Sequence, residues 1–254
     1  MKTPIKSYRI WHANRSGSTL LCQLLEDTCI AGIPGEHFTL HGEESLCQKF
    51  KVSSYKDLIN HIWSIGSTPN GVFADKASGH YQAHLDTIKE LSTLKGINMP
   101  EDYEEIWSDI FPNCKNIIII RTNKVRQAVS WWKAIQDNQW HIYEDQSVSK
   151  KKEFYDNKYD PNALMHLYKE AVLRDISNQE YLIKHGLDFI TVTYEDLIND
   201  PLRVVQLVMQ FAGLEAISNL PAFRLQRTSS EINEEWVHRF KLELQDGMEP
   251  KAWI

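Results

Sequence analysis

The sequence predicts an α/β fold in three layers, with a mainly parallel central sheet flanked by helices. Segments with strand patterning alternate with segments of helical periodicity along the chain, as they do in successive βαβ units. Four consecutive isoleucines at 117–120 indicate a strand that is buried on both faces, as in the middle of a parallel sheet. The length of 254 residues fits one large domain, or a core domain with an appended helical part. We predict a single domain over 1–254.

The expected strands are short and rich in apolar, β-branched or aromatic residues. They cover 8–13, 72–76, 116–121 and 187–193. The expected helices carry apolar residues three and four positions apart. They cover 20–28, 54–65, 81–94, 103–110, 124–134, 160–186 and 200–211, with a last helix that carries Trp236 and Phe240. Ser54 and Asp57 resemble a capping box, and Asp160 is a suitable cap for the long helix.

The composition is that of a globular protein, with 42% hydrophobic and 24% charged residues. The net charge of −6 argues against a general nucleic-acid binder, because such proteins need a basic surface. No apolar run is long enough to span a membrane, and the N-terminus lacks the apolar core of a signal peptide. We therefore expect no nucleic-acid partner, no membrane span and a cytoplasmic location.

The cysteines do not form a metal-binding or redox pattern. The chain has four of them, Cys22, Cys29, Cys47 and Cys114, and no C-x-x-C pair. We expect free thiols, as is usual in a reducing compartment.

The stretch between the first strand and the first helix, Asn14-Arg-Ser-Gly-Ser-Thr19, has the composition of an anion-binding turn. The first N–H groups of a helix lack intrahelical partners, and with the positive end of the macrodipole they attract an anion. Arg15 adds a planar guanidinium that suits phosphate or sulfate oxygens. The alternative is ordinary capping of the helix by Ser16 or Ser18.

This turn differs from the one in nucleotide triphosphatases. The Walker pattern G-x-x-x-x-G-K-[ST] requires a lysine after its second glycine. Here Ser18 follows Gly17, and His12 stands where the first glycine would be. The cation precedes the glycine, as Arg15.

A second cationic position follows the isoleucine strand, which ends in Arg121 and leads into a helix that carries Ser130. In P-loop NTPases such a strand often ends in an aspartate that helps to hold Mg²⁺. An arginine there repels a metal ion and attracts a second anionic group. The alternatives are an ion pair between Arg121 and a loop carboxylate, and a helix-surface hydroxyl for Ser130.

Glu36 and His37 lie on a glycine- and proline-containing loop directly after the first helix. A loop in this position can bring a carboxylate or an imidazole back to the start of that helix. The alternatives are a solvated carboxylate for Glu36 and a packing or surface histidine for His37. The strand 72–76 ends in Lys76, at the sheet edge where open α/β sheets bind ligands, although a lysine at a strand end is usually solvated.

Six segments stand in one order along the chain: Asn14-Arg-Ser-Gly-Ser-Thr-Leu-Leu21, the loop at Glu36, Thr68-Pro-Asn-Gly-Val72, Gln127-Ala-Val-Ser-Trp-Trp132, Tyr194-Glu-Asp-Leu197 and Glu235-Trp-Val-His-Arg239. In this combination the chain resembles the bacterial trehalose 2-sulfotransferase family, which uses 3′-phosphoadenosine 5′-phosphosulfate (PAPS). The resemblance implies a three-layer P-loop-like fold and a PAPS-dependent sulfotransferase acting on a carbohydrate hydroxyl. Trehalose, another small carbohydrate, a glycan and a glycolipid remain open as acceptors. The oligomeric state also stays open, a homodimer being one alternative.

The resemblance implies a role for each matching residue. The loop for the 5′-phosphosulfate consists of Arg15, Ser16, Gly17, Ser18 and Thr19. The 3′-phosphate is held by Arg121, Ser130 and Arg227, and the adenine is contacted by Tyr194. Glu36 is the catalytic base. The acceptor site comprises Asn14 together with Ile33, Pro34, Gly35, Glu36, His37, Phe38 and Thr39.

Residues and resemblance together predict an in-line transfer without a metal cofactor. Glu36 takes the proton of the attacking hydroxyl, while Arg15 and the helix N–H groups neutralise charge on the sulfuryl oxygens. The arginines take the place of a metal ion, and a PAPS site of this kind disfavours ATP. Two alternatives remain at this stage: a nucleotide-binding protein of the same fold without transferase activity, and a P-loop kinase, which would need Mg²⁺.

Overall fold

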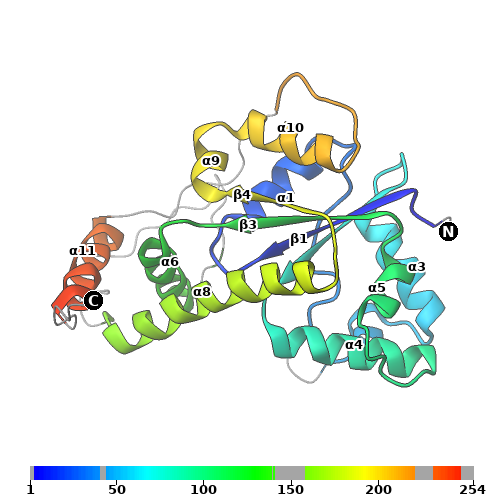
Figure 1. Ribbon diagram of the computed structural model, residues 1–254, viewed down its shortest axis with the longest axis horizontal. Helices are drawn as coiled ribbons and strands as arrows, with labels where there is room; N and C mark the ends of the chain where they lie inside the picture. The colour runs from blue at the N-terminus through cyan, green and yellow to red at the C-terminus, as the bar shows by residue number, and fades with distance from the viewer. Residues whose placement is uncertain (1–2, 41–43, 139, 141–157, 221–230, 247–254) are drawn as a thin grey trace. The chain divides into compact units, whose positions relative to one another are not determined.

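The computed structural model describes residues 3–40, 44–138, 140, 158–220 and 231–246 (Figure 1). The chain forms two compact units, one made of Met1–Ile120 with Arg174–Pro221 and the other of Arg121–Leu173 with Ala222–Ile254. The single domain expected from the sequence stays a prediction.

Within the described residues, the first unit is built on a four-stranded sheet in which all neighbouring strands are parallel (Figure 1). The strands are β1 (Lys6–His12), β2 (Val72–Ser78), β3 (Cys114–Ile120) and β4 (Phe189–Thr193), in the order β2-β1-β3-β4. The isoleucine strand β3 lies between β1 and β4, and three of its isoleucines are fully buried. The predicted parallel α/β fold is confirmed.

One face of this sheet packs against α1 (Ser18–Glu26), α9 (Tyr194–Asn199) and α10 (Pro201–Phe211). Because side chains alternate along a strand, Tyr8 and Ile10 of β1 both project to this face, where they are 1% and 0% exposed. The helices meet them with buried leucine and valine side chains: Leu21, Leu24, Leu25, Leu197, Val204, Val205 and Val208.

The opposite face packs against α3 (Tyr55–Gly66), α4 (Tyr81–Lys95), α5 (Glu104–Ile110) and Leu182 in the second half of α8 (Pro161–Lys184). Phe73 of β2 and Trp11 of β1 are the strand residues that meet these helices, and both are buried. Helices therefore cover both faces, as the three-layer prediction requires.

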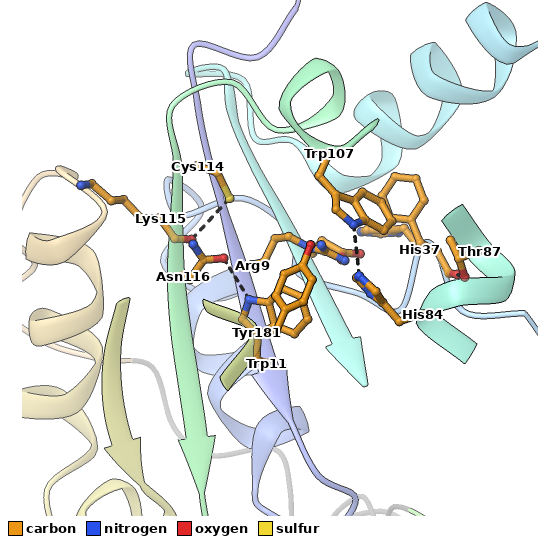
Figure 2. Close-up of polar contacts among 12 residues, drawn as sticks. Arg9, Trp11, His37, His84, Thr87, Trp107, Cys114, Lys115, Asn116 and Tyr181 are labelled. Atoms are coloured by element: carbon orange, nitrogen blue, oxygen red, sulfur yellow. Dashed lines mark hydrogen bonds and ion pairs between the residues drawn. The ribbon is translucent and has the colours of Figure 1, made fainter. Parts of the chain in front are cut away.

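A buried ion pair joins β1 to β2 under this second layer. The Arg9 Nε lies 3.3 Å from the Asp75 Oδ2, and the two side chains are 5% and 1% exposed. The guanidinium carbon lies 4.6 Å from the ring centre of Trp11 and 4.1 Å from that of Trp107. Figure 2 shows the side chains of these three residues. Burial raises the pKa of Asp75, while Arg9 opposes that rise. The pair holds β2 in place one residue before Lys76.

The second unit contains α6 (Lys124–Asp137), the first half of α8 and α11 (Glu231–Asp246). Its core is formed by Val129, Leu164, Trp236, Val237 and Phe240. Burial of Trp236 and Phe240 agrees with the amphipathic last helix expected from the sequence. An ion pair between the Arg126 guanidinium and the Glu234 carboxylate also links α6 to α11.

Two short helices were not expected, α9 and α2 (Leu46–Phe50). Their caps are local: Ser45 and Gln48 form a capping box on α2, and Thr193 accepts a hydrogen bond from the Asp196 N–H on α9. The expected cap of α3 is confirmed, because the Ser54 side chain accepts from the Asp57 N–H.

All four cysteines are free, as expected. Among the described residues, no helix combines the length and the apolar character that crossing a membrane requires.

Replacing Arg9 by methionine should lower the free energy of unfolding by about 3–5 kcal/mol, because Asp75 would then be a buried carboxylate without its cation. The measurement is equilibrium unfolding in urea at pH 7. Arg203 provides a matched control, since its guanidinium is 64% exposed and pairs with Asp196 at 3.2 Å. Arg203→Met should change the unfolding free energy by less than about 1 kcal/mol. Equal losses in the two variants would contradict the anchoring role of Arg9.

Candidate functional site

The turn between β1 and α1 bends sharply before an uncapped helix start. Arg15 and Gly17 both adopt the left-handed conformation, with φ of 62° and 91°. Gly17 is the residue that precedes the helix, and no side chain caps the helix start. Capping by Ser16 or Ser18, the alternative for this stretch, is therefore wrong. Within the described chain the buried Ser16 hydroxyl has no hydrogen-bond partner, and the first N–H groups of α1 have no intrahelical acceptor.

Tyr194, the first residue of α9, lies directly on this turn. A Cβ atom built on Gly17 would lie 2.5 Å from the Cδ2 atom of the Tyr194 ring. Gly17 is thus required twice, for its positive φ and for the close approach of the ring. The structure brings together two segments that are 177 positions apart in the sequence.

Lys76 connects the start of α1 to the loop that carries Glu36. Its ammonium group, Nζ, donates to the Thr19 Oγ1 at 3.3 Å and lies 2.9 Å from the Glu36 Oε1. The Lys76 side chain is 11% exposed, whereas that of Glu36 is 36% exposed. The loop after the first helix therefore does return its carboxylate to that helix. Lys76 lies at the end of β2, as expected from the sequence, but its contact with Glu36 was not expected.

The Glu36 loop is fixed through its backbone. The Lys76 N–H donates to the Gly35 carbonyl at 2.8 Å, which continues the sheet beside β2. Lys49 of α2 donates from its ammonium to three carbonyl oxygens of the loop, those of Glu36 at 3.1 Å, His37 at 3.4 Å and Thr39 at 3.0 Å. Desolvation lowers the pKa of Lys49, and the Glu36 carboxylate opposes that shift.

The two residues after Glu36 turn into the protein. The His37 Nε2–H donates to the Ile33 carbonyl at 3.1 Å, and its ring stacks on Phe73. Phe38 is 5% exposed and lies edge-on to Trp107. These contacts hold the loop and leave the Glu36 carboxylate as the partly exposed acidic group at its tip.

His12, the last residue of β1, is a buried neighbour of Glu36. Its Nε2 is 3.8 Å from the Glu36 Oε1, and its Nδ1 is 3.2 Å from the Ala13 carbonyl oxygen. Burial and the nearby Lys76 ammonium lower the pKa of His12 to about 3, so the imidazole is neutral at pH 7. In the sequence, His12 stood out only because it occupies the position of the first glycine of the Walker pattern.

This arrangement places a carboxylate, an ammonium and a helix start side by side. A hydroxyl group close to Glu36 can lose its proton there while an anion is held at the helix start. Comparison with known proteins identifies the chemistry: the sequence model of the Stf0 sulphotransferase family matches residues 7–243. The chain belongs to this family.

The chain is thus a sulfotransferase, and the kinase and non-enzyme alternatives give way to this assignment. It is 25% identical over 276 residues to a trehalose 2-sulfotransferase of Mycobacterium tuberculosis, with 96% of this chain and 97% of the relative covered. It is 24% identical over 268 residues to the enzyme of that name from Mycolicibacterium smegmatis, with 95% and 97% covered. The crystal structure of a sulfotransferase from Alicyclobacillus acidocaldarius has a TM-score of 0.52 at 16% identity, with 94% of this chain and 93% of that one covered, which supports the shared fold.

Three further residues were expected at the donor site, Arg121, Ser130 and Arg227, and one at the acceptor site, Asn14. Arg121 is half-buried and follows β3 directly in the chain, and Ser130 is 9% exposed on α6. Both belong to the second unit. Arg227 lies outside the described residues. Asn14, in the first unit, accepts a hydrogen bond from the Arg174 guanidinium at 3.2 Å.

Gly17→Ala should lower the free energy of unfolding by about 1–3 kcal/mol, because alanine is strained at positive φ and its methyl group meets the Tyr194 ring. It should also weaken binding of the sulfate donor, since the ring or the turn must move. Urea unfolding and calorimetric titration measure the two effects. Gly96→Ala is the control, because φ there is 75° and nothing lies within 4 Å of the added Cβ. An equal loss of donor affinity in both variants would contradict the contact between Gly17 and Tyr194.

Proposed function

We propose that this sulfotransferase moves a sulfuryl group from PAPS to a hydroxyl of a carbohydrate acceptor. The observation that carries the proposal is the Lys76 ammonium, which holds both the Thr19 hydroxyl at the helix start and the Glu36 carboxylate. An anion site and a general base are thereby kept within the reach of one side chain. A transfer from an anionic donor to a deprotonated hydroxyl needs this juxtaposition.

The 5′-phosphosulfate binds to the turn formed by Arg15, Ser16, Gly17, Ser18 and Thr19. Left-handed φ values at Arg15 and Gly17 support this role, because they bend the chain sharply before the helix starts. The helix N–H groups, the Arg15 guanidinium and the serine hydroxyls donate to the phosphosulfate oxygens. Tyr194 contacts the adenine, and the close approach of its ring to Gly17 supports that assignment.

The 3′-phosphate binds to Arg121, Ser130 and Arg227. Arg121 follows β3, and in the sheet the end of that strand is paired with the end of β1, His12 beside Ile119. The proposed anion-binding turn follows the same end of β1 in the chain, as Arg121 follows the end of β3. The carboxyl ends of the strands form the edge where parallel α/β sheets bind nucleotides.

The transfer is a direct in-line displacement. The acceptor oxygen attacks sulfur while Glu36 takes its proton, and the bond between sulfur and the bridging oxygen breaks, leaving its electron pair on 3′-phosphoadenosine 5′-phosphate (PAP). Arg15, the helix N–H groups and Lys76 neutralise the charge on the sulfuryl and bridging oxygens. These fixed cations supply the electrostatic role that a metal ion has in phosphoryl transfer.

The acceptor binds to Asn14 and the segment Ile33–Thr39, beside the open side of Glu36. Two curated relatives carry the name trehalose 2-sulfotransferase, which supports a small carbohydrate such as a disaccharide here. Within this segment the side chains of His37 and Phe38 pack into the protein and hold the loop in place. Glu36 is the residue that contacts the acceptor hydroxyl. A cytoplasmic location and a homodimer stay predictions.

Glu36→Gln should lower kcat for sulfuryl transfer from PAPS to trehalose by about 10²–10⁴-fold, because the amide cannot take the proton. Binding of PAP should stay within about twofold of wild type, because the anion site is unchanged. The measurements are release of PAP from PAPS and calorimetric titration with PAP. The control Glu26→Gln alters an exposed carboxylate at the end of α1 and should leave kcat unchanged. Wild-type turnover in Glu36→Gln would refute the role as base.

PAP should raise the melting temperature far more than ATP at equal concentration, because only PAP carries a 3′-phosphate. At a ligand concentration one hundred times Kd the stabilisation is about 2.7 kcal/mol, which corresponds to several degrees in a chain of this size. Excess EDTA should change neither the shift nor the rate of transfer. Equal shifts with ATP and PAP, or loss of transfer in EDTA, would contradict the PAPS site or the metal-free reaction respectively.

A further inference from the structure

His12 is a buried imidazole to which the transfer described above gives no role. It ends β1, is 3% exposed, and its Nε2 has no hydrogen-bond partner within the described chain. The nearest charged oxygen is the Glu36 Oε1 at 3.8 Å. A buried polar atom of this kind usually has a partner in some state of the molecule.

The hydrogen bond on the other side of the ring determines which nitrogen carries the proton. The Nδ1 lies 3.2 Å from the Ala13 carbonyl oxygen, which can only accept. The Nδ1 therefore donates, and in a neutral imidazole the Nε2 then carries a lone pair. An ionised Glu36 carboxylate can also only accept. The His12 Nε2 and the Glu36 Oε1 therefore cannot form a hydrogen bond with each other before the reaction.

Burial, together with positive groups from two elements, keeps the ring neutral. Lys76 of β2 and Arg174 of α8 both oppose protonation of His12, and Lys49 of α2 interacts electrostatically with Glu36. The Glu36 carboxylate is the one cause of opposite sign among the side chains that face the ring. Lys76 also occupies the Glu36 Oε1 at 2.9 Å, so the resting base is held by an ammonium.

We propose that His12 is a positioning residue that accepts a hydrogen bond from Glu36 once Glu36 has taken the proton of the acceptor hydroxyl. The proposal rests on the proposed function, because it needs Glu36 to act as the base. The proton leaves the acceptor oxygen, forms an O–H bond at the Glu36 Oε1, and is then shared with the Nε2 lone pair. A rotation of the partly exposed carboxylate closes the gap of 3.8 Å.

This contact makes Glu36 a stronger base. A hydrogen bond that exists only in the protonated form of a carboxyl stabilises that form and raises its pKa. It also reaches full strength only as the proton arrives, so it favours the transition state over the ground state. Removing the Nε2 acceptor should therefore lower the pKa of Glu36 during turnover and slow the proton transfer.

Two substitutions separate the nitrogens of the ring. His12→Asn keeps an amide N–H near the Nδ1 position, where it can still donate to Ala13, but has no atom at the Nε2 position. His12→Gln places an amide oxygen near the Nε2 position, where it can accept from Glu36. In transfer from PAPS to trehalose we expect His12→Asn to lower kcat by about tenfold. The acid limb of its kcat/KM profile should move to lower pH by about one unit.

His12→Gln should recover part of the lost kcat and return the acid limb towards wild type. A structural role alone would lower stability or PAP affinity in both variants and leave the acid limb in place. That result, or a wild-type rate in His12→Asn at an unchanged PAP affinity, would overturn the proposal.

A measurement without turnover keeps the proposal distinct from the proposed function. In protein labelled with ¹⁵N-histidine, the His12 signal, assigned by its loss in His12→Asn, should show a proton on Nδ1 and none on Nε2 at pH 7. In Glu36→Gln the new amide can donate, so the Nε2 signal should shift as expected for an accepted hydrogen bond. A proton on Nε2 in the wild-type protein would overturn the proposal. A correct tautomer without sulfuryl transfer to any tested carbohydrate would instead count against the proposed function.

Discussion

The site depends on the Lys76 ammonium group, a poorly hydrated charge that needs polar partners. Lys76 is 11% exposed, and a charge with so little water around it must be paired. Its two partners, the Thr19 hydroxyl and the Glu36 carboxylate, come from the helix after β1 and from the loop that follows that helix. The need to neutralise Lys76 thus draws together the segment that we propose to bind the donor and the segment that carries the proposed base.

Strand alternation explains why this ammonium reaches the site. In the parallel register, Arg9 pairs with Asp75 and Ile10 pairs with Lys76. Neighbouring residues point to opposite faces, so Asp75 meets Arg9, whose guanidinium lies over the Trp107 ring of α5, whereas Lys76 points to the layer of α1. His12 shares the face of Ile10 and reaches the same side two residues further along. The same register of β1 and β2 therefore positions the Arg9–Asp75 ion pair on one face of the sheet and Lys76 with His12 on the other.

The sequence was sufficient for features that local patterns determine. The isoleucines of β3 predicted a central parallel strand, and Asn14–Thr19 predicted a turn before a helix. Anion binding by that turn stays a proposal. The link from Lys76 to Glu36, and the position of His12 behind it, depend on the pairing of β1 with β2, whose residues are far apart in the sequence. No local pattern reports such pairing. The helix α9 was missed because its six residues are too few to show a helical period.

The departure from the Walker pattern has a physical consequence at the same place. In that pattern the lysine follows the glycine and belongs to the anion-binding turn itself. Here Ser18 stands at that position, and an ammonium arrives from the neighbouring strand, where it touches the turn and the carboxylate together. In the transfer that we propose, protonation of Glu36 ends its ion pair with Lys76, and the positive charge of Lys76 is then no longer offset. That charge then acts on the anion at the helix start at the moment when the leaving group becomes more negative, so proton transfer and stabilisation of the leaving group are coupled through one side chain.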